Sequence, residues 1–323
     1  MEALDTGATA WMLMSASLVL LMTPALAFFY GGMSRTKSVL NMMMMSMGVL
    51  AVIGVIYPLW GYSMSYGATS VGGLFANPFD GFNLAGLIYD ADGNFVLDGM
   101  GVPVIVGVAF QATFAIITVA LISGAIADRT KFSTWLVFSG IWATLAYFPM
   151  AHMVWGGGLL SGSENSLASM IFGSTDGEAN VAPIDFAGGT VVHINAGIAA
   201  LVLALVVGKR KGFGKQAFRP HNIPFVMLGA ALLWFGWFGF NAGSAFTADG
   251  AAGLAWVNTT SATAAAILGW IITEKVRFGH MTALGAASGV VAGLVAITPA
   301  AGSVSPFGAI VLGAIAGSVC SLA

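Results

Sequence analysis

Long uncharged segments, separated by short charged clusters, dominate the hydrophobic and polar pattern of the chain. A bilayer crossing takes about 20 apolar residues. The segments long enough are 6–34, 38–79, 99–127, 132–163, 186–208, 220–248, 250–273 and 278–323. The last is interrupted by Pro299, Gly302 and Pro306, so we expect two helices in it. Because no strand-like alternation competes with helix, the pattern predicts an all-α polytopic membrane protein with nine transmembrane helices.

The basic residues predict how these helices are oriented. All eleven Lys and Arg residues fall in four clusters, at 35–37, 129–131, 209–219 and 275–277. Successive clusters are two predicted helices apart, so all four are expected at one end of the bundle. By the positive-inside rule that end is cytoplasmic, which predicts a plasma or inner membrane protein with its N-terminus outside. The first apolar run has no preceding Lys or Arg, so we expect it to be a helix and not a signal peptide.

An outside N-terminus makes the first five helices end inside, and the following helices then run in the opposite sense. Transporters built this way contain inverted repeats around a central pore. We therefore predict a first five-helix repeat at 1–208, a cytoplasmic basic loop at 209–223 and an incomplete second repeat of four helices at 224–323. Either the fold has no repeat, or the chain lacks the last repeat element.

Composition excludes several classes of protein. Of 323 residues, 58% are hydrophobic and 7% charged, whereas soluble domains carry about 25% charged residues. A soluble enzyme, a nucleic-acid binder and a disordered scaffold are excluded. Cys320 is the single cysteine, and the predicted helices contain no paired carboxylates, Ser/His/Asp set or His-x-x-x-His spacing. We expect no catalytic residues, metal site or cofactor.

His193 is the strongest candidate for a functional residue inside a predicted transmembrane helix. If Asp185 caps the outer end of the fifth helix, His193 lies about 12 Å deeper, near the bilayer midplane. Eight residues also rotate the helix by about 80°, so the two side chains need not touch. An intramembrane histidine serves either in a pore or proton path, or as a structural hydrogen bond between helices.

Aromatic residues form further candidate sites, each with an ordinary packing alternative. Trp237, Phe240 and Ser244 recur on one face of the sixth helix. Phe110 and Phe114 are neighbours on the third helix. Trp155, at the outer end of the fourth, could equally be an interfacial anchor.

The spacing of glycines predicts close packing of helices, and one basic run predicts a loop that faces the lipid surface. The four-residue repeats are Gly239/Gly243, Gly285/Gly289/Gly293 and Gly313/Gly317, which let helices approach closely. The run from Gly208 to Lys215 lacks the Gly-Lys-Ser/Thr ending of a phosphate loop. A lipid-facing cytoplasmic loop is the better interpretation.

Six strings in order resemble bacterial ammonium transporters of the Amt/Mep/Rh family, over nearly the whole chain. They are Ala27-Phe-Phe-Tyr-Gly-Gly32, Phe114-Ala-Ile-Ile-Thr-Val-Ala-Leu121, Ala151-His-Met-Val-Trp-Gly-Gly-Gly158, Asp185-Phe-Ala-Gly-Gly-Thr-Val-Val-His-Ile-Asn195, Gly208-Lys-Arg with Pro220-His-Asn222, and Gly236-Trp-Phe-Gly-Phe-Asn-Ala-Gly-Ser244. The resemblance implies a homotrimer of eleven-helix protomers, each with one narrow pore.

The resemblance also assigns roles to residues. Trp155 and Ser244 would form an external ammonium site, with Phe110 and Phe114 beside it. Phe114 and Phe240 would close the pore as stacked rings, and His193 would be the first of two pore histidines. The remaining pore-wall or structural positions would be Asp185, Tyr147 and Trp237.

The family continues through a tenth helix with the second pore histidine and an eleventh helix, so we expect this chain to be a fragment. The expected activity is ammonium recruitment outside, deprotonation, passage of ammonia and reprotonation inside. The resemblance also implies a PII-type regulatory protein as a cytoplasmic partner. The alternatives are an Rh-type gas channel for ammonia or carbon dioxide, which needs no cation site, and a membrane ammonium sensor.

Overall fold

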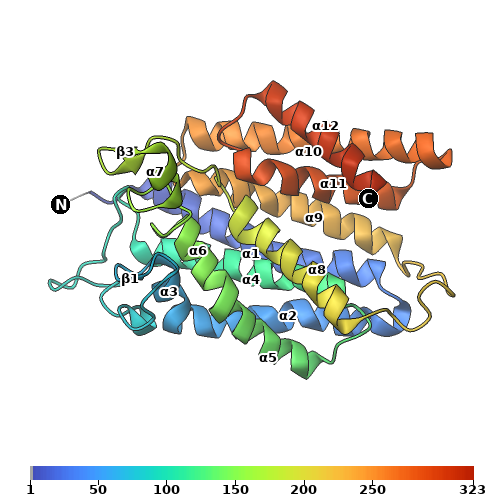
Figure 1. Ribbon diagram of the computed structural model, residues 1–323, viewed down its shortest axis with the longest axis horizontal. Coiled ribbons are helices and arrows are strands. Elements are labelled where there is room, and N and C mark those ends of the chain that lie inside the picture. Colours follow the sequence, from blue (N-terminus) through green and yellow to red (C-terminus); the bar gives the residue numbers. More distant parts are fainter. Residues whose placement is uncertain (1–2) are drawn as a thin grey trace.

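Helices make up most of the structure, a computed structural model that describes residues 3–323 (Figure 1). The helices are α1 (Thr6–Met33), α2 (Val39–Ile56), α3 (Tyr62–Tyr66), α4 (Val104–Ile122), α5 (Phe132–Trp142), α6 (Phe148–Val154), α7 (Leu167–Phe172), α8 (Asn195–Val207), α9 (Ile223–Asn241), α10 (Gly250–Phe278), α11 (Ala283–Ile297) and α12 (Pro306–Leu322). Two small antiparallel hairpins, β1 (Ser70–Val71) with β2 (Phe75–Ala76) and β3 (Ser174–Thr175) with β4 (Glu178–Ala179), lie in the loops. Residues 1 and 2 of the predicted first repeat lie outside the described residues.

The predicted all-α membrane architecture is confirmed. Within residues 3–323, eight apolar helical segments are long enough to cross a bilayer: Thr6–Met33, Thr36–Tyr66, Val104–Ile126, Phe132–Val154, Gly189–Val207, Ile223–Ala245, Gly250–Phe278 and Ala283–Ala300. The ninth, α12, has 17 residues, which is about 26 Å of helix. All nine fall within the predicted segments except for the start of the second, at Thr36, and the end of the seventh. The repeat boundaries stay a prediction.

The seventh helix is longer than the charge pattern predicts. We expected an end at residue 273, before Glu274, but α10 continues to Phe278. Lys275 and Arg277 occupy its last turn, where positive charge interacts favourably with the free carbonyls of a helix C-terminus. Gly279, with φ of 83°, then ends the helix in a left-handed conformation.

Three of the spans contain a π-helical stretch, which the hydrophobic pattern did not predict. These stretches are Tyr57–Gly61, Ala143–Tyr147 and Gly189–Ile194. Pro58 lies within the first, and Pro149 follows the second. Because proline has no N–H to donate to the preceding turn, the helix must rearrange its hydrogen bonds there. The third stretch carries His193.

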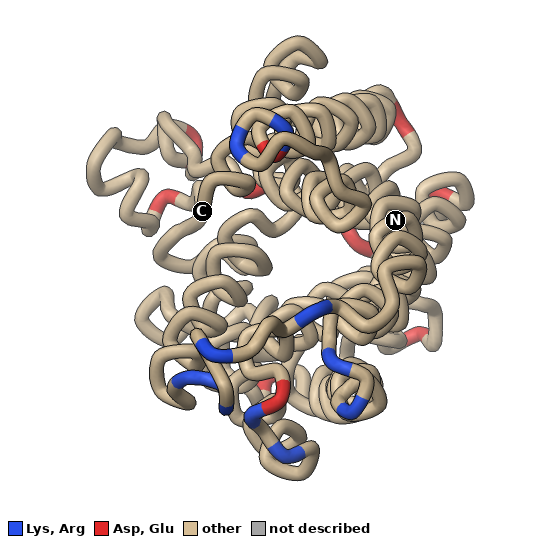
Figure 2. Tube along the Cα trace, turned by 90° about the vertical axis from the view of Figure 1, so that its right-hand side faces the viewer, with Lys and Arg blue, Asp and Glu red and all other residues tan. Residues whose placement is uncertain are grey.

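The four basic clusters gather at one end of the bundle, as predicted. Figure 2 views that end, where α1, α4, α8 and α10 finish. We call it the basic end, and the opposite end the acidic end. The two acids beside the basic clusters have local partners: Asp128 forms an ion pair with Arg35 at 2.7 Å, and Glu274 accepts hydrogen bonds from the N–H and hydroxyl of Thr282. The other basic residues therefore leave this end strongly positive.

Glycines bring helices together through their backbones, as their spacing predicts. A Cβ added to Gly239 of α9 would lie 2.8 Å from the Ser15 carbonyl oxygen of α1. One added to Gly293 of α11 would lie 2.7 Å from the Cα of Thr263 on α10. Both distances are shorter than van der Waals contact, so these helix pairs need glycine.

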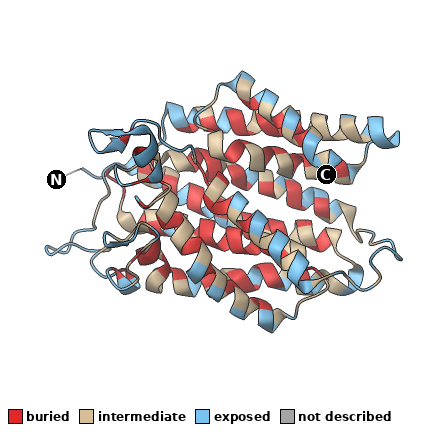
Figure 3. Cartoon of the chain, viewed as in Figure 1, coloured by how far each residue is buried: buried red, intermediate tan, exposed pale blue. Residues whose placement is uncertain are grey.

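Exposed residues lie on the outside of the bundle (Figure 3), and many of them are large and apolar. On α8 the exposed row includes Ile198, Leu201, Val202 and Leu205. Water would penalise such a surface, whereas lipid does not.

Replacing Gly313 of α12 with alanine tests the glycine packing. The new methyl group would meet the backbone of Ala262 on α10. We expect a destabilisation of about 2 kcal/mol, because a backbone cannot yield as a side chain does. Thermal unfolding of the detergent-solubilised protein, followed by circular dichroism, measures it. Gly253→Ala on α10 faces open space, so it should leave the unfolding temperature unchanged or raise it. Equal unfolding temperatures of the two variants would contradict the packing role of Gly313.

Candidate functional site

Two stacked phenyl rings block the centre of the bundle. Phe114 of α4 and Phe240 of α9 have ring centroids 4.2 Å apart and an angle of 22° between their planes. Both side chains are almost completely buried. The two predicted gate residues therefore meet, although they are 126 positions apart in the sequence.

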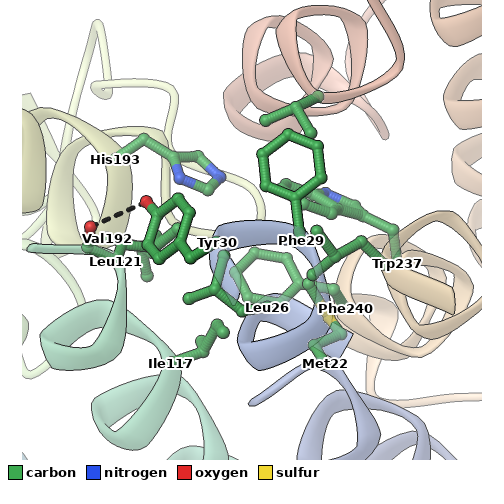
Figure 4. Close-up of a pocket in the computed structure, with 12 residues that line it drawn as sticks. Met22, Leu26, Phe29, Tyr30, Ile117, Leu121, Val192, His193, Trp237 and Phe240 are labelled. Carbon is green, nitrogen blue, oxygen red and sulfur yellow. Dashed lines mark hydrogen bonds between the residues drawn. The ribbon is translucent and has the colours of Figure 1, made fainter. Parts of the chain in front are cut away.

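A narrow cavity lies on the basic side of this stack (Figure 4). Its volume is about 30 Å³, enough for one or two molecules of the size of water. The lining residues are Met22, Leu26, Phe29, Tyr30, Ile117, Leu121, Val192, His193, Leu233, Trp237, Phe240 and Val291. The cavity is therefore almost wholly apolar, and His193 contributes the one imidazole of its lining, which in its neutral form has one nitrogen that donates and one that accepts a hydrogen bond.

His193 is held between rings and one hydroxyl. Its imidazole stacks on Trp237 at 5.4 Å and on Phe240 at 5.8 Å between ring centroids. Its Nε2 atom lies 3.3 Å from the hydroxyl of Thr298. The histidine thus lines the cavity and also forms a side-chain contact between two helices.

The hydrogen bonds of Thr298 decide which imidazole nitrogen carries the proton. The single hydroxyl proton of Thr298 is donated to the carbonyl oxygen of Leu294 at 2.7 Å. Its oxygen accepts from Nε1 of Trp237 at 2.9 Å. A hydroxyl has one donor and two acceptor positions, so His193 must be the donor in its contact with Thr298. The proton of neutral His193 is therefore on Nε2, and Nδ1 carries the free lone pair.

Aromatic rings continue on the acidic side of the stack. Phe110 lies 4.7 Å and Trp155 6.0 Å from the ring centroid of Phe114, both edge to face. The indole nitrogen of Trp155 donates to the carbonyl oxygen of Asp185 at 3.0 Å. This hydrogen bond fixes the orientation of the indole, which a simple interfacial anchor would not require.

Ser244 lies one helical turn beyond Phe240, towards the acidic end. Its hydroxyl donates to the carbonyl oxygen of Phe240 at 2.8 Å. Because the hydroxyl proton is used inside the helix, the oxygen presents only lone pairs to its surroundings. Such an oxygen can accept a hydrogen bond from a donor such as N–H.

Asp185 caps the fifth span, as predicted. Its carboxylate accepts hydrogen bonds from the backbone N–H groups of Gly188, Gly189, Thr190 and Val191. Burial raises the pKa of Asp185, and these four N–H groups offset part of that effect. His193 uses Thr298 as its side-chain partner, so the carboxylate acts on the helix and not on the histidine.

Sequence reasoning placed Tyr147 beside the pore and overlooked three other residues. Tyr147 is buried against Phe148 and is absent from the cavity lining. Thr298 was overlooked because a lone threonine in an apolar helix gives no periodic signal. Phe246 stacks edge to face on Phe110 at 5.7 Å and has a left-handed backbone. Tyr30 forms the inner wall of the cavity.

Tyr30 separates the cavity from the basic end. Its hydroxyl donates to the carbonyl oxygen of Leu121 at 2.8 Å. The same side chain lines a second cavity of about 420 Å³, which also contacts Asp128, Arg210 and Phe218. A route from end to end is therefore interrupted at the phenyl stack and again at Tyr30.

The described part of the chain contains no group of three or more His, Cys, Asp or Glu side chains that could hold a metal ion.

Comparisons with known proteins agree with the architecture. The profile of the Ammonium Transporter Family matches residues 10–323. An ammonium transporter of Mycobacterium bovis is 56% identical over 99% of this chain and 67% of its own length. The crystal structure of Candida albicans Mep2 superposes with a TM-score of 0.85 at 31% identity, over 99% of this chain and 66% of that one. A structure described as a sensor Amt protein superposes with a TM-score of 0.82 at 26% identity, over 98% of this chain and 74% of that one. This chain thus spans about two thirds of the length of the first two relatives.

Asp185→Asn tests the capping geometry. The amide nitrogen that replaces one oxygen would face N–H donors, so two of the four hydrogen bonds would be lost. We expect the amides of residues 188–191 to exchange hydrogen at least tenfold faster in the variant. Hydrogen–deuterium exchange with mass spectrometry measures the rates. Asp249→Asn removes a capping carboxylate of α10 at the same end of the bundle, and it should leave residues 188–191 unchanged. Unaltered exchange at 188–191 in the Asp185 variant would refute the role.

Proposed function

The chain belongs to the ammonium transporter family, and from that premise we propose that the protein recruits ammonium at its acidic end and conducts ammonia towards its basic end. One observation carries this proposal: the Phe114/Phe240 stack lies directly over a cavity of one or two small molecules, whose lining contains His193. An apolar passage of this size admits a neutral molecule and opposes a hydrated ion.

Recruitment would use the groups on the acidic side of the stack. Trp155, Phe110 and Phe114 offer ring faces and edges, and a cation over an aromatic face gains about 2 kcal/mol when it is desolvated. The Ser244 oxygen can accept one N–H of ammonium, because its own proton is bound to Phe240. Potassium has a similar radius but no proton to release, so only ammonium can become a neutral molecule that passes the stack.

Deprotonation would take place before the stack. A bare ammonium ion would lose its hydration and find few acceptors in the cavity, whereas ammonia crosses at much lower cost. The ion would therefore transfer its proton on the acidic side to a water molecule, from which the proton would follow towards His193, and neutral ammonia would pass when the Phe114 and Phe240 rings move apart. Reprotonation would follow beyond Tyr30, where the cavity at the basic end is large enough for water.

His193 would provide the polar contact inside the cavity. Its Nδ1 lone pair can accept a hydrogen bond from ammonia, and its Nε2–H is held by Thr298. An imidazole can also take up a proton on one nitrogen and release one from the other. We propose that His193 relays or holds the proton during transport.

The other assigned residues would support the site. Trp237 forms part of the cavity wall and orients Thr298. Asp185 stabilises the start of the fifth span and holds Trp155 through its carbonyl oxygen, while its negative charge favours cations at the entrance. Tyr147 would lie outside the cavity lining and would pack behind the site.

The proposed setting is a homotrimer in the cell membrane. The positive-inside rule puts the basic end in the cytoplasm and the N-terminus outside. A PII-type regulatory protein would meet the cytoplasmic loops, including residues 209–219.

A sensor remains the second candidate, because one structural neighbour is described as a sensor Amt protein. A transporter moves ammonium through the bundle, whereas a sensor only needs to bind it. Flux through purified protein in liposomes therefore separates the two functions. A gas channel would conduct without the cation site, so its flux would be insensitive to Ser244.

Ser244→Ala should weaken recruitment. Loss of a hydrogen bond to a charged ligand costs about 1.5 kcal/mol or more, so we expect the ammonium concentration for half-maximal flux to rise about tenfold. Flux is measured in proteoliposomes with the full gene product. Ser17→Ala is the matched control, because the Ser17 hydroxyl also donates to the carbonyl four residues earlier but lies on the outside of α1. A gas channel would show equal flux in both variants.

His193→Gln and His193→Leu distinguish a proton role from a structural one. Glutamine can still donate to Thr298 but cannot carry a proton at neutral pH, and leucine can do neither. We expect ammonium-dependent current to be lost in both variants, while thermal stability falls only in the leucine variant. If glutamine restores the current, His193 acts structurally. A wild-type protein that passes current with potassium but none with ammonium would overturn the mechanism.

A further inference from the structure

We infer that the acidic end contains a binding site for a small alkylammonium ion, in a cavity between the end of α3 and the start of α4. The volume of this cavity is about 170 Å³. Its lining includes Tyr62, Tyr66, Asp98, Gln111 and Phe246. It shares no residue with the His193 cavity, and neither Trp155 nor Ser244 lines it. The site is therefore separate from the proposed ammonium site, and it does not depend on ammonium being the transported substrate.

Asp98 gives the cavity a negative charge that no basic residue neutralises. All eleven Lys and Arg residues lie in the clusters at the basic end. Among residues 3–323, the one ion pair joins Arg35 to Asp128 at that end. Asp98 accepts the backbone N–H groups of Met100 and Val102 with a single oxygen, Oδ1. Its second oxygen is therefore left for a cation.

Two residues of the lining carry buried oxygen atoms without a hydrogen-bond partner among residues 3–323. They are Gln111, with its Oε1 atom, and Tyr66, with its hydroxyl. An amide oxygen can accept hydrogen bonds but cannot donate them, and a buried polar atom without a partner destabilises the protein. The missing partner of Gln111 must therefore be a donor. Beside a carboxylate that has no basic partner, a donor with a positive charge binds best.

Aromatic rings and the size of the cavity favour an organic cation over ammonium itself. The rings of Tyr62 and Tyr66 lie 5.2 Å apart between centroids, and Phe246 completes the aromatic part of the lining. Such rings attract cations and also bury alkyl groups. Water, which is similar in size to ammonium, occupies about 30 Å³, so ammonium would leave most of the cavity empty. An alkylammonium ion of about five heavy atoms would fill it and still present N–H donors to Gln111 and Asp98.

Phe246 links this cavity to the proposed ammonium site. Its ring lies edge to face on Phe110, with 5.7 Å between centroids, and its backbone has a φ of 61°. A left-handed backbone is unfavourable for a residue with a Cβ, and strain of this kind is concentrated where a ligand is held. A bound alkylammonium ion would therefore contact a wall of the ammonium site without entering it.

Two isomeric cations test the site. Diethylammonium and tetramethylammonium have the same atoms and the same charge, but the first carries N–H groups and the second carries none. Because a hydrogen bond to a charged group contributes about tenfold in affinity, diethylammonium should bind at least that much more tightly. Isothermal titration calorimetry of the full gene product in detergent measures both affinities. Equal affinities of the two isomers, or binding of neither, would overturn the site.

Matched variants locate the bound cation. Asp98→Asn should weaken diethylammonium binding about tenfold or more, because the charge is lost while the amide oxygen can still accept the same backbone N–H groups. Asp90→Asn is the control, since Asp90 also accepts two backbone N–H groups with one oxygen but lies outside the cavity lining. Gln111→Met should weaken binding about tenfold through loss of its acceptor. Thermal unfolding followed by circular dichroism checks that each variant is folded.

Ser244→Ala separates this site from the proposed ammonium site. Diethylammonium should bind this variant as it binds the unmodified protein. Equal losses in the Asp98 and Asp90 variants would mean general attraction to an acidic surface and would overturn the site. A loss in the Ser244 variant alone would put the cation in the ammonium site and would also overturn it. The expected binding in a protein without ammonium flux would support this site and contradict the proposed transport.

Discussion

A polar group in a lipid bilayer must find its hydrogen-bond partner within the protein, and the centre of this molecule is arranged around that constraint. Thr298 shows it most directly. One hydroxyl serves the Leu294 carbonyl, the Trp237 indole and the His193 imidazole. Without water to replace any of these partners, each is fixed by the other two. The tautomer of His193 in the apolar cavity is thus set by Thr298, which does not itself line the cavity.

The same constraint shapes the outer end of the site. Asp185 gives its carboxylate to four backbone N–H groups and its carbonyl oxygen to Trp155. One residue therefore starts a membrane-spanning helix and orients an aromatic ring of the proposed ammonium site. This double use couples the stability of the fold to the geometry of recruitment.

Charge is confined to the two ends because it is too costly elsewhere. At the basic end, Arg210 and Phe218 line both the cavity next to Tyr30 and the cavity beside α8. The same two residues therefore border two separate cavities at this end of the bundle.

The sequence by itself determined the all-helical membrane architecture and the common end of the basic clusters, because hydrophobic length and charge act locally along the chain. It also predicted that Asp185 caps the fifth span and that the glycine repeats are packing positions. Only the tertiary structure brought Phe114 onto Phe240, and only it revealed the role of Thr298, since such contacts join helices far apart in the sequence. The π-helical stretch carrying His193 was equally invisible, because a π turn differs from an α turn in its hydrogen bonds and not in its composition.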